Sequence, residues 1–169
     1  MAATCNATIA LSVVATLNNA LDVGSVSYPV AYSSVINLTD GTGANQCKEI
    51  FTDTRTLTAS ANEDLDLSGV LTDAFGTSLV FTKIKAIIVT ADAANTNDVV
   101  IGGAASNQFS TMTGAVTDKI KVGPGGLFCV VAPNAAAYAV TAATGDLLRV
   151  TNGGAGTSVT YTVIIIGVV

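Results

Sequence analysis

The sequence predicts an all-β protein built as a sandwich or barrel of short antiparallel strands, and three observations carry that prediction. Val, Ile, Thr, Ala and Gly fill a chain of 169 residues in which only 11% are charged, a composition that favours strands. Apolar and polar residues alternate with a period of two in several short segments. Turn signals rich in glycine separate these segments at a spacing of about 8–12 residues, which is typical of sandwiches and barrels.

Three segments show the alternation most clearly. In Phe51–Thr58 every second residue is a threonine, which predicts one exposed face and one face in the core. In Lys83–Val89 the two lysines are expected on one face, with Ile84, Ala86 and Ile88 on the other. The shorter segment Lys119–Val122 repeats this pattern of lysine and isoleucine.

Glycine-rich turns connect the predicted strands. Asn152–Gly156 is expected to close a hairpin between Asp146–Thr151 and Ser158–Gly167. Gly123–Gly126 is expected to reverse the chain between Lys119–Val122 and the apolar run that follows it.

The first 23 residues resist this interpretation. Met1–Leu21 is apolar without a clear period, which fits a strand, a helix or an arm that becomes ordered on assembly. We expect an N-terminal arm over residues 1–23 and a single β-sandwich domain over residues 24–169, since no linker or charge run marks a second domain.

The sequence contains few residues or motifs that would indicate catalysis, metal binding or nucleic-acid binding. It has no histidine, the commonest general base and metal ligand, and no tryptophan. The acidic residues Glu63, Asp64 and Asp66 fit a charged loop, and Asp92–Asp98 lacks the ligand spacing of an EF-hand. We therefore expect no enzyme, no cofactor, no metal and no small-molecule substrate. The seven basic residues are scattered and the apolar C-terminus is too short for a bilayer, which disfavours nucleic-acid and membrane partners.

The three cysteines, Cys5, Cys47 and Cys129, form no CxxC motif. Their number allows one disulfide and leaves one cysteine over, and we expect buried free thiols in a reducing cytoplasm. Cys129 lies within the apolar run Leu127–Ala132, where a core thiol is expected.

Two groups of sequence segments resemble those of a known protein family. The resemblance covers roughly residues 45–167 and carries no active-site motif. It rests on the segments Ile50–Gly69, Leu71–Gly76, Asp118–Gly126, Val131–Pro133, Tyr138–Ala142 and Asp146–Asn152. These resemble small virion structural proteins of tailed bacteriophages, which are similar to capsid cement or decoration proteins with a jelly-roll-like β-sandwich.

The resemblance implies a non-enzymatic protein made in the bacterial host cytoplasm and located on the capsid surface of the virion. Its implied partners are the major capsid protein and further copies of itself, as a homodimer or homotrimer. The alternatives are a β-domain of a tail fibre or baseplate and a carbohydrate-binding adhesin, which would use exposed tyrosines.

The candidate interface residues fall into two groups. Ile9, Leu11, Val13 and Leu17 belong to the expected arm, whose apolar side chains would be buried on assembly. Asp53 and Arg55 interrupt a strand that is otherwise neutral and rich in threonine. The second pair also fits an ion pair within the chain, of the kind that contributes less than about 1 kcal/mol at a surface.

Overall fold

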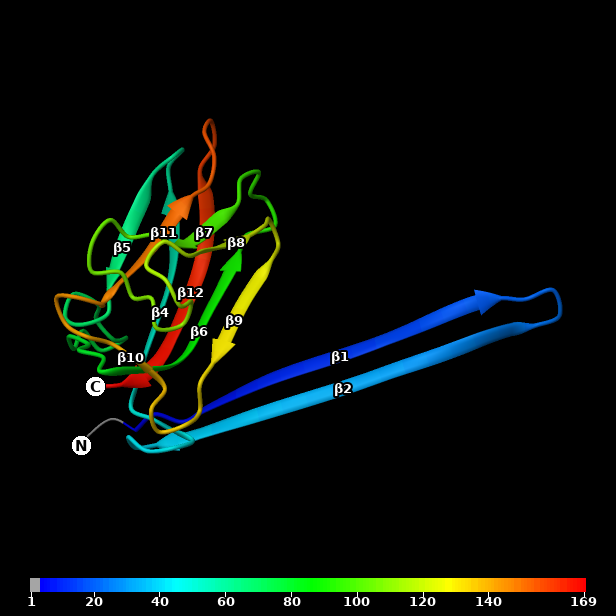
Figure 1. Cartoon of the computed structure of the whole chain (residues 1–169), viewed down its shortest axis with the longest axis horizontal. Helices are drawn as coiled ribbons and strands as arrows, with labels where there is room; N and C mark the ends of the chain where they lie inside the picture. The colour runs from blue at the N-terminus through cyan, green and yellow to red at the C-terminus, as the bar shows by residue number, and fades with distance from the viewer. Residues whose placement is uncertain (1–3) are drawn as a thin grey trace.

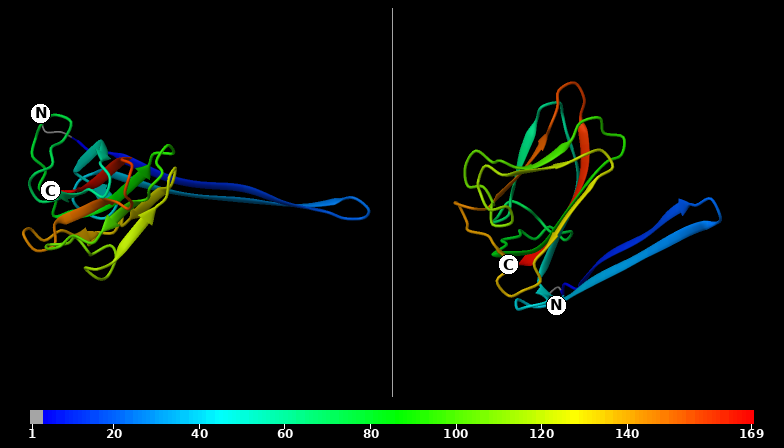
Figure 2. Two further views of the ribbon diagram at one scale, coloured as in Figure 1. Left: turned by 90° about the horizontal axis from the view of Figure 1, so that it is seen from above. Right: turned by 45° about the vertical axis from the view of Figure 1, so that its right-hand side comes forward.

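A long two-stranded hairpin projects from a β-sandwich (Figures 1 and 2). The computed structural model describes residues 4–169, and the expected all-β fold is confirmed. The hairpin consists of β1 (Ala7–Ala20) and β2 (Ser25–Asp40), which pair antiparallel without a break from Ala7 opposite Leu38 to Ala20 opposite Ser25. The short strand β3 (Gln46–Cys47) pairs in parallel with the end of β2.

The sandwich consists of a five-stranded and a four-stranded sheet. The first has the order β10-β6-β12-β4, and β9 also pairs with β6. Its strands are β4 (Glu49–Leu57), β6 (Lys83–Ala91), β9 (Leu127–Val131), β10 (Tyr138–Ala139) and β12 (Val159–Val168). The second sheet has the order β5-β11-β7-β8. Its strands are β5 (Asn62–Asp66), β7 (Val99–Gly102), β8 (Lys119–Val122) and β11 (Leu147–Asn152).

The main core lies between the two sheets. The central strand β12 contributes Val159, Tyr161, Val163 and Ile165, none more than 1% exposed. From the opposite sheet come Val99, Ile101, Leu148 and Val150, which are equally buried. Burial of each such aliphatic side chain contributes about 1.5–3 kcal/mol to the stability of the folded state. The hairpin therefore projects from a well-packed sandwich.

Both expected chain reversals turn out to connect the two sheets. β11 pairs with β5 and β7, whereas β12 pairs with β4 and β6, so Asn152–Gly156 does not close a hairpin. Likewise β8 pairs with β7 and β9 pairs with β6 on either side of Gly123–Gly126. The amide of Gly153 donates to the carbonyl of Asp98 at 2.9 Å, which holds the turn after β11 over the end of the sandwich.

The alternation in β4 is confirmed, but the one in β6 is wrong. Phe51 and Leu57 are buried and the threonines between them are exposed. In β6 the register against β12 shifts at Ile166/Gly167, which is a β-bulge. Because of that shift Ile84 joins the main core, Ala86 faces the opposite side of the sheet, and Lys85 is fully buried.

The expected division of the chain at residue 23 falls in the turn of the hairpin. Residues 25–40 pair with β1 along its whole length, so they lie outside the sandwich to which they were assigned. Residues 1–3 of the expected arm lie outside the described residues.

Candidate interaction surface

The hairpin has one apolar face and one polar face. Residues directly opposite in an antiparallel pair stand on the same face, and successive residues alternate between faces. The register therefore brings every second residue of both strands together on one face, which we call the apolar face. Its apolar members are Ile9, Leu11, Val13, Ala15 and Leu17 from β1, and Val26, Tyr28, Val30, Tyr32 and Ile36 from β2. Asn19 and Ser34 are polar residues on the same face. The other face carries mainly Ser, Thr, Ala and Asn, with Val14 and Val35 as its larger apolar residues.

The apolar face is largely open to solvent. Leu17 is 72% exposed, Tyr28 is 65% exposed, and Leu11 and Tyr32 are each 56% exposed. Asp22, at the tip, is the one charged residue between Ala7 and Thr39. Between Ala7 and Thr39 no charged side chain of the two strands therefore opposes burial of this face against another apolar surface.

A second, smaller core anchors the base of the hairpin on the outer face of the five-stranded sheet. Cys5, Leu38 and Cys47 pack there against Ala86 and Ile166 of the sheet, all of them at most 8% exposed. Partly buried neighbours extend this cluster from both sides, namely Ala7, Ile9, Ile36, Val131 and Ile164. The hairpin base is thus a packed part of the molecule, and only its outer length is without contacts to the sandwich (Figure 1).

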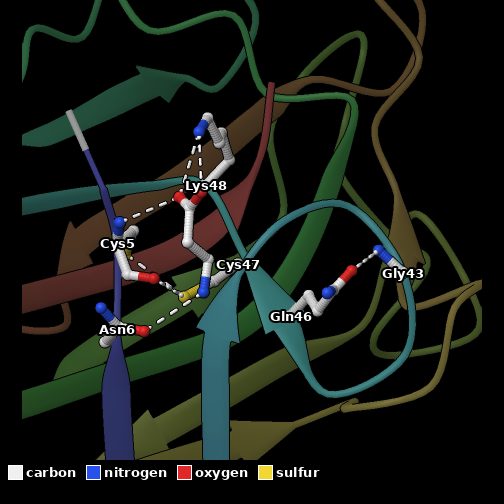
Figure 3. A network of polar contacts seen from close by, with 7 residues as sticks. Cys5, Asn6, Gly43, Gln46, Cys47 and Lys48 are labelled. Atoms are coloured by element: carbon white, nitrogen blue, oxygen red, sulfur yellow. Dashed lines mark hydrogen bonds and ion pairs between the residues drawn. The ribbon is translucent and has the colours of Figure 1, made fainter. Parts of the chain in front are cut away.

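Asp40, the last residue of β2, forms the polar part of this anchor. Figure 3 shows its partners Cys5, Asn6 and Lys48. Its carboxylate accepts a hydrogen bond from the amide of Cys5 at 3.1 Å and an ion pair from the Lys48 ammonium at 3.0 Å. The Asp40 amide in turn donates to the side chain of Asn6 at 3.2 Å. The Cys5 amide first, and then Lys48, lower the pKa of Asp40.

The loop after β2 is fixed by two further contacts. The side chain of Gln46 accepts a hydrogen bond from the amide of Gly43 at 2.7 Å (Figure 3). Lys85, buried at the bulge, donates to the carbonyls of Gly43 and Asn134 and so ties this loop to the one after β9. Burial, and then the neighbouring Lys83, lower the pKa of Lys85. Gly41 has φ +142°, and a Cβ there would lie 2.6 Å from the Gln46 side chain, so the loop needs glycine at this position.

A groove of about 430 Å³ lies between the hairpin and the outer face of β9. The hairpin side of the groove is the inner part of the apolar face, including Leu11 and Tyr32. The sandwich side is formed by Leu127, Cys129 and Val131. The apolar face therefore continues from the exposed hairpin into the angle between hairpin and sandwich that Figure 2 shows.

Cys129 corrects one expectation about the core. Phe128 and Val130 pack against the main core, so the alternation of β9 turns Cys129 outward, where it is exposed. Cys5 and Cys47 are buried free thiols, as expected. Burial, and then the neighbouring Cys47, raise the pKa of the Cys5 thiol to about 12.

The structure separates the two groups of expected interface residues. Ile9, Leu11, Val13 and Leu17 all lie on the apolar face. Asp53 and Arg55 lie in the sandwich, where Arg55 pairs with Asp53 at 3.0 Å and with Glu63 of β5.

Arg55 and its partners join the two sheets through ionic and hydrogen-bonding contacts within the chain. The hydroxyl of Tyr161 donates to the other oxygen of Glu63 at 2.8 Å. Burial, and then this bond to Glu63, raise the pKa of Tyr161. The arrangement matches the alternative interpretation of Asp53 and Arg55, an ion pair within the chain.

Half of the apolar face was missed at the level of the sequence. Val26, Tyr28, Val30 and Tyr32 alternate with small or polar residues, which is a period-two signal of the same kind as in β4. In β1 the same signal is partly hidden, because Val14 and Ala10 place apolar residues between the alternating ones.

The described residues show neither a metal-binding cluster nor a membrane-spanning helix. Residues 4–169 hold no cluster of three or more acidic or cysteine side chains placed to bind a metal ion. In the same range no helix has the length and apolarity needed to cross a bilayer.

Comparison with known proteins gives no relative. No family model, no curated protein and no solved structure matches the chain.

Proposed function

We propose that this protein is a non-enzymatic structural protein of a phage virion, a capsid cement or decoration protein that binds and stabilises the shell of major capsid protein. The observation that carries the proposal is the apolar face of the hairpin, which projects from a rigid sandwich and is almost free of charge. The resemblance of residues 45–167 to virion structural proteins of tailed phages points in the same direction.

An exposed apolar strip of this kind favours a function in assembly. Soluble monomers seldom expose contiguous apolar patches larger than a few hundred Å² unless the patch binds something. Within residues 4–169, the outer edge of β1 and most of the outer edge of β2 have no neighbouring strand. Such edges accept an added strand from a partner, so the hairpin offers main-chain pairing and apolar burial together.

The strand order of the sandwich supports a jelly roll, the fold that we propose for it. The sandwich has eight strands from β4 to β12 when the short β10 is left out. Counted in chain order, the first, third, sixth and eighth of these strands form one sheet, and the other four form the second sheet. The order β4-β12-β6-β9 faces the order β5-β11-β7-β8, which is the pattern of two interleaved Greek keys. Jelly rolls are common in viral capsid proteins.

The proposed partners are the major capsid protein and further copies of this chain, as a homodimer or homotrimer on the capsid surface. The hairpin would lie across neighbouring capsid subunits, with the apolar face buried and the sandwich outside. Many equivalent contacts of modest area then add up over the shell, because each site is repeated by symmetry.

Co-sedimentation with expanded, undecorated phage capsids tests the proposal. The intact protein is expected to bind saturably, at a copy number that fits the symmetry of the shell. The matched variant replaces residues 12–33 by Asn-Gly, which joins the opposed residues Leu11 and Ser34 by a two-residue turn and keeps the hairpin base. We expect this variant to fold with an unchanged sandwich and to lose binding. Absence of saturable binding by the intact protein would reject the proposal.

One observation favours a second candidate, a carbohydrate-binding adhesin or tail-fibre domain. Tyr28 and Tyr32 stand exposed on the same face of the hairpin, where aromatic rings could stack on sugars. Retention of the protein on immobilised glycans, or its recovery with purified tails, would support this candidate in place of the first.

A further inference from the structure

Cys5 and Cys47 lie side by side under the base of the hairpin (Figure 3). Their Sγ atoms are 3.2 Å apart, and the Cys47 thiol also lies 3.5 Å from the carbonyl oxygen of Cys5. The two residues are 42 positions apart in the sequence, so the fold has brought them together. They are 8% and 0% exposed.

Their place in the fold gives a bond between them a specific consequence. Cys5 precedes the first residue of β1, and Cys47 belongs to β3, which pairs with the end of β2. A covalent link would therefore join the two ends of the hairpin at the point where it meets the sandwich. The side chains that pack on the pair are apolar, namely Leu38, Ala86 and Ile166. The carboxylates of Asp40 and Glu49 near Cys5 are not partners for thiol–disulfide exchange, and they add to the rise that burial causes in the pKa of the Cys5 thiol.

We propose that Cys5 and Cys47 are an oxidation site, at which a low-molecular-weight disulfide such as oxidised glutathione closes a disulfide bond across the hairpin base. The reaction converts two thiols and one small disulfide into the protein disulfide and two small thiols. Two electrons pass from the cysteine sulfurs to the oxidant, and the two thiol protons leave with its products. The inference does not rest on the proposed function.

The burial of the pair determines how the reaction proceeds. Cys5 is the more exposed of the two, so its thiolate attacks the small disulfide first and releases one small thiol. Cys47 then attacks the mixed disulfide at Cys5 and releases the second. Since burial raises the pKa of Cys5 to about 12, the thiolate is scarce at neutral pH, and closure is slow and faster in alkaline solution. In a reducing cytosol the pair stays open.

Counting free thiols before and after oxidation tests the site. The purified full chain is incubated with oxidised glutathione and then denatured in acid, which stops thiol exchange. Free thiols are alkylated with N-ethylmaleimide at neutral pH in denaturant, and the number of labels is read from the intact mass of the protein by mass spectrometry. The reduced protein accepts a label on each of its three cysteines. After oxidation we expect both Cys5 and Cys47 to be unlabelled and joined in one linked peptide, whether or not the exposed Cys129 has taken up glutathione. Labels retained on both Cys5 and Cys47, or a stable glutathione adduct on Cys5, would each overturn the proposal.

Two variants separate the proposed bond from other oxidation. Cys129→Ser should still lose both remaining labels on oxidation, because the buried pair is intact. Cys47→Ser should never form the internal bond and should show the same melting temperature with and without oxidant. In the wild-type chain we expect oxidation to raise Tm by roughly 8–15 °C, given the length of the closed loop. An unchanged Tm in wild-type protein that has lost two labels would reject the role of the bond in holding the hairpin.

Discussion

Val13 in β1 lies directly opposite Tyr32 in β2, and both side chains stand on the apolar face of the hairpin. The same register places Leu17 opposite Tyr28. Each pair sets an aliphatic side chain beside an aromatic one, a combination that stabilises antiparallel strands. A register slip of one residue would pair apolar with polar positions, so these pairs both specify the hairpin and create the surface that it presents.

The first prediction concerns the outer part of the apolar face. Leu17→Asp is expected to weaken capsid binding at least tenfold, because burial of a leucine side chain contributes about 1.5–3 kcal/mol and a buried carboxylate opposes binding. Leu17 is 72% exposed and lies in the hairpin, outside the core of the sandwich, so the melting temperature of the sandwich should change little even though the pair with Tyr28 is lost. Co-sedimentation over a range of protein concentrations measures the affinity.

Val14→Asp is the matched control for this variant. Val14 is 81% exposed, neighbours the same part of β1 and lies on the opposite face. The two variants carry the same change in charge, so only the face differs. Equal loss of binding in both would show that charge on the hairpin, and not burial of the apolar face, determines attachment.

The second prediction uses Cys129 as a probe of the groove between hairpin and sandwich. In free protein Cys129 is the exposed cysteine, so a maleimide dye in slightly alkaline buffer should label it before the buried pair. On decorated shells we expect its labelling rate to fall several-fold, because a capsid segment would fill the groove beside Leu11 and Tyr32. The labelling reaction is quenched at a series of times, and the fluorescence of the protein band on a gel gives the rate. An unchanged rate on shells would exclude the groove from the interface.

The sequence predicted the fold class well because its strongest signals are local. Strict alternation in β4 and glycine-rich turns depend on near neighbours, and both correspond to strands and turns in the structure. Sheet membership depends on distant partners, so Asn152–Gly156 was assigned to a hairpin although it joins strands of different sheets. The chain reversal expected at Gly123–Gly126 likewise joins strands of different sheets. The position of Lys85 was missed because a single bulge in β6 reverses the faces on either side of it.

The candidate surface was predicted in half. The apolar residues of β1 were singled out by composition, whereas those of β2 were assigned to the sandwich. The pairing of the two strands could not be deduced from β1 alone, since its alternation is interrupted at Val14. The contact between Cys5 and Cys47 follows from the fold of the hairpin base and has no local signal in the sequence.

The third prediction concerns Arg55, which lies in the sandwich and away from the apolar face. Arg55→Ala should lower the free energy of unfolding by about 1–2 kcal/mol, because Glu63 loses a charged partner while Tyr161 still donates to it. Urea denaturation measures this change. Lys121→Ala is the control: its ion pair with Asp98 is more exposed, and we expect a loss below about 0.5 kcal/mol. Capsid binding should be unchanged in both variants. A loss of binding in Arg55→Ala alone would show that Arg55 belongs to the interface, as expected from the sequence.

The fourth prediction concerns the pH dependence of the hairpin anchor. The pKa of Asp40 is lowered from 3.8 by the amide of Cys5 and by Lys48, so the folded protein favours the carboxylate more than the unfolded chain does. The stabilisation is therefore fully present above about pH 3.8 and is lost as the pH falls through the lower pKa of the folded state. Asp40→Asn keeps an acceptor for the Cys5 amide and removes the ion pair with Lys48. Melting curves of both proteins should differ most near neutral pH and converge toward pH 2 (roughly the end of carboxylate titration). A difference in Tm that stays constant over this range would show that the charge of Asp40 does not contribute to the anchor.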